Sequence, residues 1–155
     1  MDITYQTESY HDVINEIKPL LEDHYEEVAM YKEHIEFNPN YELYLHMDQT
    51  GDIHIFTARD QDVGGAIVGY CVTFMQHHPH YMDHIYAVND IIYVADEYRH
   101  TEVAPEMIMR LEKEMQDEGA SVMTFHMKTY KPFRTLMESL NFEEAEILYS
   151  KYIKE

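Results

Sequence analysis

Residues 91–115 read IIYVADEYRHTEVAPEMIMRLEKEM, and three successive patterns in this stretch decide the fold. The run IIYV at 91–94 is rich in β-branched residues and is typical of a strand. A short polar turn follows it, and Pro105 then fits the first turn of a helix. The apolar stripe of that helix consists of Ile108, Leu111 and Met115. Gly119 stands where a helix C-terminal cap belongs. A strand, a turn and an amphipathic helix in this order predict an α/β architecture.

The chain before this stretch supplies most of the predicted strands. Residues 2–6 predict a first strand, and Ser9 predicts the N-cap of a helix that runs to Val28, with Pro19 expected to kink or split it. Alternation of apolar and polar residues predicts a strand over 41–47. The further strands are predicted at 53–58, 66–75 and 85–94, and the segment HHPHYMDH at 77–84 is predicted to be a loop.

The chain after this stretch predicts three more elements. They are a strand at 122–127, a short helix from Pro132 and a closing strand at 145–153. No internal repeat or Pro/Gly-rich linker divides the sequence. We therefore expect residues 1–155 to form a single α/β domain in which helices flank the strands.

The composition limits the classes of function. The chain has 155 residues and a formal net charge of −19, with 30 acidic and 11 basic residues. Such a surface repels phosphate, so nucleic acid and anionic membranes are poor candidates for direct partners, whereas cationic molecules are attracted. The lone Cys71 can form no intramolecular disulfide. No signal peptide or membrane span is evident, and we expect a cytoplasmic protein.

The stretch quoted above also resembles a known family. A strand that ends in Val, an acidic-Tyr-Arg turn and an amphipathic helix are similar to the acyl-CoA site of the GNAT N-acetyltransferase superfamily. The segment FRTLMESLNFEEAEILYSKYI resembles the closing turn and last strand of that superfamily. The stretch NDIIYVADEYR at 89–99 looks most like short acetyltransferases that bacteriophages encode. The resemblance implies a mixed, mostly antiparallel central sheet flanked by about four helices.

The resemblance also implies a function and a cofactor site. The protein is expected to transfer an acetyl group from acetyl-CoA directly to a primary amine of a small molecule or protein. The splayed strand would hold the pantetheine arm, and the loop before the helix would wrap the pyrophosphate, which a helix N-terminus stabilises. The residues expected to bind the cofactor are Ile92, Tyr93, Val94, Arg99, His100, Thr101, Glu102, Val103 and Ala104.

Three residues depart from the family pattern. Glu102 stands where the phosphate loop has glycine, and the five glycines of the chain leave none between Gly69 and Gly119. Met137 occupies the position where the family often has a tyrosine as general acid, and Asn141 replaces the glycine of the closing turn. Glutamate adds bulk and negative charge beside a phosphate. An alternative function is therefore a retired acetyltransferase scaffold that acts as an acidic interaction protein such as a DNA mimic.

The candidate catalytic residues come from the strand and its neighbouring loops. Asp90 is the first candidate for the base that keeps the attacking amine neutral, because strand alternation would place it on one face with Ile92 and Val94. His84 is a second candidate, together with Asp83. Tyr130 is the nearest tyrosine that could replace Met137 as proton donor.

The remaining features concern metals and partners. The spacing of His77, His78, His80 and His84 matches no strong metal signature, and we predict a polar loop and no metal site. The acidic surface favours cationic acceptors such as polyamines, aminoglycoside-like amines or lysines of a basic protein. The fourteen tyrosines make a homodimer plausible.

Overall fold

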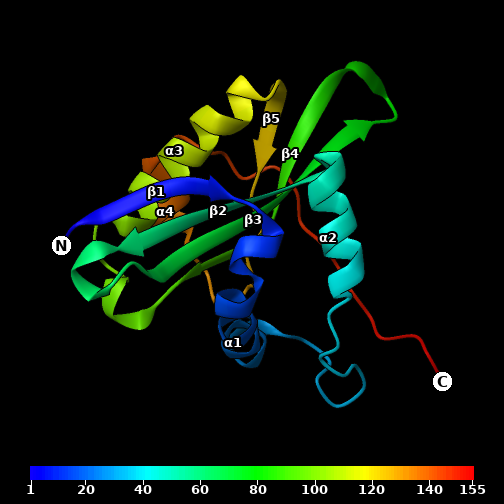
Figure 1. The fold of residues 1–155 in the computed structure, drawn as a ribbon. Coiled ribbons are helices and arrows are strands. Elements are labelled where there is room, and N and C mark those ends of the chain that lie inside the picture. The colour runs from blue at the N-terminus through cyan, green and yellow to red at the C-terminus, as the bar shows by residue number, and fades with distance from the viewer.

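The computed structural model describes all residues, 1–155, and its centre is a five-stranded sheet (Figure 1). The strands lie in the order β1 (Ile3–Glu8), β2 (Ile53–Asp60), β3 (Ala66–His78), β4 (Tyr81–Val94) and β5 (Ala120–Thr124). The first four strands pair antiparallel, and β5 pairs parallel with β4. The structure therefore confirms the predicted mixed, mostly antiparallel sheet.

Four helices cover the sheet (Figure 1). They are α1 (Tyr10–Val28), α2 (Tyr41–Thr50), α3 (Val103–Asp117) and α4 (Arg134–Ser139), and short 3-10 turns lie at Gln61–Val63 and Asp96–Tyr98. The side chain of Ser9 caps α1 by accepting the N–H of Asp12, as predicted. Gly119 has a φ of 98° just after the last turn of α3. This is the left-handed conformation expected of a glycine that ends a helix.

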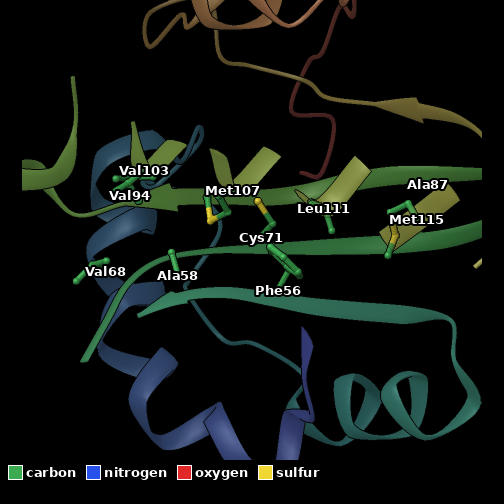
Figure 2. Close-up of a cluster of buried hydrophobic side chains, with 10 residues drawn as sticks. All are labelled: Phe56, Ala58, Val68, Cys71, Ala87, Val94, Val103, Met107, Leu111 and Met115. Carbon is green, nitrogen blue, oxygen red and sulfur yellow. The ribbon is translucent and has the colours of Figure 1, made fainter. Parts of the chain in front are cut away.

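The two faces of the sheet carry separate apolar cores. Val103, Met107, Leu111 and Met115 of α3 pack on one face, against strand side chains that include Phe56 and Cys71 (Figure 2). The opposite face packs against α1 and α2, through a cluster that includes Val13, Ile17, Ile55, Tyr70, Val72 and Tyr93. The apolar stripe of α3 predicted from the sequence is fully buried. The opposite face of the sheet is covered by α1 and α2.

The strand predicted at 41–47 is wrong, because residues 41–50 form helix α2. Asn40 accepts the N–H of Leu43 and so starts a helix, and Gly51 ends it with a φ of 79°. The half-buried residues Tyr41, Tyr44, Leu45 and Met47 fit helical spacing as well as alternation. Because the pattern is short, the apolar residues alone do not distinguish a strand from a helix, and the capping residues at its two ends do.

Of the two outcomes predicted at Pro19, a kink or a split, the split is wrong, because α1 continues through this residue. Pro19 removes the N–H that would bond the carbonyl of Asn15, four residues earlier. Both residues lie on the exposed side of α1, so water can bond that carbonyl.

Two further predictions are wrong, a loop at residues 77–84 and a strand at residues 145–153. Residues 77–84 are no loop, since β3 continues to His78 and β4 begins at Tyr81, leaving a tight hairpin. Residues 145–153 form no strand, because their backbone pairs with no neighbour, and Leu148 and Tyr149 are 91% and 90% exposed. The end of the chain instead reaches the loop between α1 and α2, where the ring of Tyr152 stacks on His34 at 4.5 Å between centroids. None of the helices has the length and apolar character needed to cross a membrane.

Candidate active site

The centre of the site is the place where β4 and β5 separate. The two strands pair only from Ile85 to Val88, opposite Ala120 to Thr124, so residues 89–94 of β4 pair with β3 alone. The N–H of Ala95 bonds the carbonyl of Val68. Ladder groups alternate along a strand, so the backbone of Tyr93 faces β3 while that of Ile92 and Val94 faces the open edge. This edge can accept another extended chain.

A β-bulge lies where the strands separate. Val72 pairs with Ile91 and Thr73 pairs with Asn89, which leaves Asp90 as the extra residue of β4. The buried side chain of Asn89 holds this geometry, because its Nδ2 donates to the carbonyl oxygens of Ile91 at 2.9 Å and Val72 at 3.3 Å. The bulge is therefore a fixed feature of the strand.

The bulge changes the surroundings that the sequence predicted for Asp90. Strand alternation was expected to group Asp90 with Ile92 and Val94, which pack toward α3. That grouping is wrong, because the extra residue breaks the alternation and the Asp90 charge acts on Tyr44 and Tyr70 on the opposite face. Burial raises the pKa of the Asp90 carboxyl, and nearby His126 offsets part of that rise. A half-buried carboxylate thus lies where the two strands part.

The loop from Arg99 to Ala104 presents free backbone donors. The N–H groups of His100, Thr101, Glu102 and Ala104 donate no hydrogen bond within the chain, whereas Val103 donates to the Thr101 hydroxyl. Successive free amides at the start of a helix form a site suited to an anion. The structure thus leaves four donors where the resemblance implies a pyrophosphate.

Glu102 fits this loop without glycine geometry. Its φ is −73°, which any residue adopts, and the left-handed position of the loop is His100 with a φ of 65°. Burial raises the pKa of Tyr5, and the charges of Glu106 and Glu102 contribute to the same rise. The Glu102 carboxylate therefore lies within electrostatic reach of β1. In the closing turn, Asn141 also has a φ of 65°, a conformation that asparagine tolerates where the family has glycine.

Arg99 joins the loop to α1. Its guanidinium donates two hydrogen bonds to the Glu27 carboxylate, at 2.8 Å from Nη1 and 2.9 Å from Nη2, and its Nε donates to the Val94 carbonyl at 2.8 Å. The hydrogen bonds from Arg99 lower the pKa of Glu27. A paired, planar contact of this kind fixes the position of α1 relative to the end of β4.

A hollow of about 320 Å³ lies beside the open edge of β4. Its walls come from the last turns of α1, the loop at 36–39, Tyr44 of α2 and Ile91 of β4. His24 lines it and meets the ring of Tyr93 edge-on, at 6.1 Å between centroids. Burial lowers the pKa of His24, so its imidazole is neutral at pH 7. No motif in the sequence marks His24, so it was not predicted as a site residue.

Among the other sequence candidates, His84 and Asp83 lie apart from Asp90. His84 lies six residues before Asp90 on β4, which is about 20 Å at the rise of a strand, and its Nδ1 is 2.8 Å from the Ser121 hydroxyl. Asp83 is exposed beside it. The Tyr130 hydroxyl donates to the carbonyl of Val28 at the end of α1. Met137 is buried, as its apolar character predicts.

The histidines of the β3–β4 hairpin pack as aromatic rings. His78 lies 4.6 Å from Tyr81 and 5.0 Å from Tyr86 between ring centroids. No group of three or more His, Cys, Asp or Glu side chains in the chain is arranged to hold a metal ion.

The geometry agrees with the comparisons made with known proteins. A sequence model described as the acetyltransferase (GNAT) family matches residues 14–140. The chain belongs to the GNAT acetyltransferase family. No curated protein sequence matches it. The family assignment establishes acetyl transfer as the general class of reaction and agrees with the resemblance seen at residues 91–115.

Solved GNAT structures share the fold at low sequence identity. An aminoglycoside acetyltransferase from an uncultured soil metagenomic sample has 16% identity and a TM-score of 0.77, covering 99% of this chain and 100% of its own. A ribosomal-protein-alanine N-acetyltransferase from Brucella melitensis biovar Abortus 2308 has 18% identity and a TM-score of 0.71, covering 100% and 99%. Glucosamine-6-phosphate N-acetyltransferase from Arabidopsis thaliana has 11% identity and a TM-score of 0.72, covering 99% and 100%. These likenesses show the fold alone.

Proposed function

We propose that this GNAT protein transfers an acetyl group from acetyl-CoA to a primary amine by direct attack of the amine on the thioester. The observation that carries the proposal is the open edge of β4 beside Asp90, which continues toward the free amides of residues 100–104. A long, partly anionic molecule with an extended amide-containing arm matches that surface in shape and polarity.

The residues present fit coenzyme A. The free N–H groups of His100, Thr101, Glu102 and Ala104 would bind the pyrophosphate oxygens. The backbone of Ile92 and Val94 would pair with the pantetheine arm, while the Val94 carbonyl already accepts Arg99. Glu102 would supply its backbone amide, and the charge of its carboxylate also acts on Tyr5 of β1. Bound acetyl-CoA supplies a thioester whose carbonyl carbon an amine can attack.

The chain's own groups would manage the protons. Asp90 would accept a proton from the acceptor ammonium, so that the amine reacts in its neutral form. Its carboxylate is half-buried and has few competing partners, which suits a base. Tyr130 is proposed as proton donor to the departing thiolate, and its hydroxyl would have to leave the Val28 carbonyl to do so. His84 is the reserve candidate for the base, at a greater distance along β4.

Titration calorimetry with acetyl-CoA tests the cofactor site. We expect micromolar binding by the natural sequence and tighter binding by Glu102→Gln, which removes a charge near the phosphates without adding backbone freedom. Glu112→Gln removes an exposed charge from the same helix and serves as the matched control, with unchanged affinity expected.

Turnover in the presence of amines tests the reaction itself. Release of free thiol from acetyl-CoA, dependent on an added amine, supports the proposal, and Asp90→Asn should abolish most of it. Absence of acetyl-CoA binding by the natural sequence and by Glu102→Gln alike would overturn the proposal. That result would favour the alternative of a retired scaffold that acts as an acidic interaction protein.

A further inference from the structure

The hollow beside Asp90 has apolar walls, although the protein as a whole is strongly acidic. Leu21 and Val28 of α1, Phe37 of the following loop and Ile91 of β4 line it. The rings of Tyr25 and Phe37 meet there at 4.9 Å between centroids. Seven of its eleven lining residues are hydrophobic, so most of a molecule bound there would contact carbon.

The floor of the hollow is also apolar. A smaller cavity of about 20 Å³ lies behind it, between α1, α2 and the sheet, and all of its lining residues are hydrophobic. Leu21, Tyr44 and Ile91 line both spaces. The buried Tyr10 hydroxyl, on the smaller cavity, has no hydrogen-bond partner. The surface shared by the two spaces is thus made of hydrocarbon and aromatic side chains.

Polar groups are few and lie at defined places. Glu36 is the one carboxylate among the lining residues, and it lies in the loop at the mouth of the hollow. His24 faces the hollow from α1, beside Tyr93 of the open strand. Asp90 is next to the lining residue Ile91 in sequence. This arrangement offers Asp90 to one ammonium group at β4, whereas Glu36 is the one lining carboxylate open to a second positive charge and a third has none among the lining residues.

We propose that the acceptor is a primary amine carried on an apolar or aromatic body, and that polycations such as polyamines and aminoglycosides are poor acceptors. This inference rests on the amine acetylation proposed above and specifies its substrate class. The acidic surface attracts any cation toward the protein, and the hollow then selects the cation that can leave water along most of its length.

Steady-state kinetics with saturating acetyl-CoA and four acceptors tests the inference. The acceptors are 2-phenylethylamine and isopentylamine, as apolar monoamines, and spermidine and kanamycin, as polycations. We expect kcat/KM for 2-phenylethylamine to exceed that for spermidine by tenfold or more. An equal or reversed order overturns the inference while the proposed acetyl transfer stands. Acetyl-CoA binding without turnover of any amine overturns both.

Two variants that add the same negative charge test whether the preference for apolar amines arises in the hollow. Phe37→Asp places a carboxylate in the wall of the hollow and should lower the ratio of kcat/KM for 2-phenylethylamine to that for spermidine at least fivefold. Ile35→Asp adds it two residues away, at a side chain that is 49% exposed and outside the lining, and should leave the ratio within twofold. Both variants must bind acetyl-CoA as the natural sequence does. Equal shifts in the two variants would overturn the inference.

Discussion

At the scale of single residues, the site depends on two neighbours with opposite roles. Asn89 is buried and satisfied, with its amide on two carbonyl groups, and it keeps the bulge in place. Asp90 is the extra residue of the bulge, and its carboxylate is partly buried, which raises its pKa. A carboxylate in such surroundings costs stability and is available for proton transfer.

Removal of the Asn89 amide should destabilise the fold. Asn89→Leu keeps the volume of the side chain but leaves the carbonyls of Val72 and Ile91 without these donors, so we expect a loss of about 1–3 kcal/mol in the free energy of unfolding. Urea denaturation measures it. Gln116→Leu changes an exposed amide on α3 and should shift the free energy by less than about 0.5 kcal/mol. Equal effects of both substitutions would contradict the role given to Asn89.

Replacement of Asp90 should separate activity from stability. Burial raises the folded-state pKa of Asp90 above its unfolded value, so ionisation of Asp90 favours unfolding, and this penalty is present at neutral pH and absent below the unfolded pKa. Asp90→Asn should therefore be more stable than the natural sequence at pH 7 and equally stable near pH 3. Its kcat should fall by about 10²-fold or more. Denaturation at both pH values and thiol release measure these effects, and a less stable variant at pH 7 would contradict the interpretation.

At the scale of elements, three contacts arrange the helices around the open strand. Arg99 binds Glu27 and so holds the cofactor loop against α1. The Tyr130 hydroxyl donates to the end of the same helix. α2 brings Tyr44 over the sheet, next to the bulge. The end of α1 is thus where the cofactor loop, the hollow and the loop before α4 meet.

The Glu27–Arg99 pair should make α1 docking depend on pH. The lowered pKa of Glu27 means that the pair stabilises the fold above the unfolded carboxyl pKa and that this contribution is lost as pH falls through the folded value. Glu27→Gln should cost about 1 kcal/mol at pH 7 and progressively less as pH falls below the unfolded carboxyl pKa, measured by urea denaturation. Glu106→Gln, which breaks the more exposed pair with Arg110, should cost about 0.5 kcal/mol or less.

The sequence predicted elements well where local signals and burial agree. The stripe of α3 was identified correctly because Pro105, Gly119 and the apolar period point to the same helix. The helix at 41–50 was missed because its seven-residue alternation fits two periods and only the Asn40 cap distinguishes them. Asp90 is a half-buried carboxylate in a strand, as the sequence indicated, and its role as the base stays a prediction. Its direction was predicted wrongly because a bulge depends on the register with β3, which one strand's sequence does not specify.

At the scale of the whole molecule, long-range arrangement and charge decide what reaches the site. The hollow is lined by residues as far apart in sequence as Leu21 and Ile91, so no local sequence pattern predicts it. The net charge of −19, in contrast, is evident from the sequence alone. Most of its carboxylates lie on exposed surface, where they act on diffusing ions.

The charge of the molecule should appear in the salt dependence of the reaction. For a cationic amine acceptor, we expect kcat/KM to fall about threefold or more between 20 and 300 mM NaCl, because ions screen the attraction. The anionic acetyl-CoA serves as an internal control, since its KM should fall or stay constant over the same range. A salt-independent kcat/KM for the amine would contradict electrostatic attraction by the surface.

The β-bulge also bears on how such a site can diverge between lineages. Asp90 is the extra residue of the bulge and has no partner on β3, so another side chain can replace it while the pairs on either side keep their register. Deletion of the position would join the pair of Val72 with Ile91 and the pair of Thr73 with Asn89 into a regular ladder, which would remove the bulge without changing the register. Evolution can therefore exchange the chemistry at this point by substitution or remove it by deletion, and in both cases the rest of the sheet keeps its pairing.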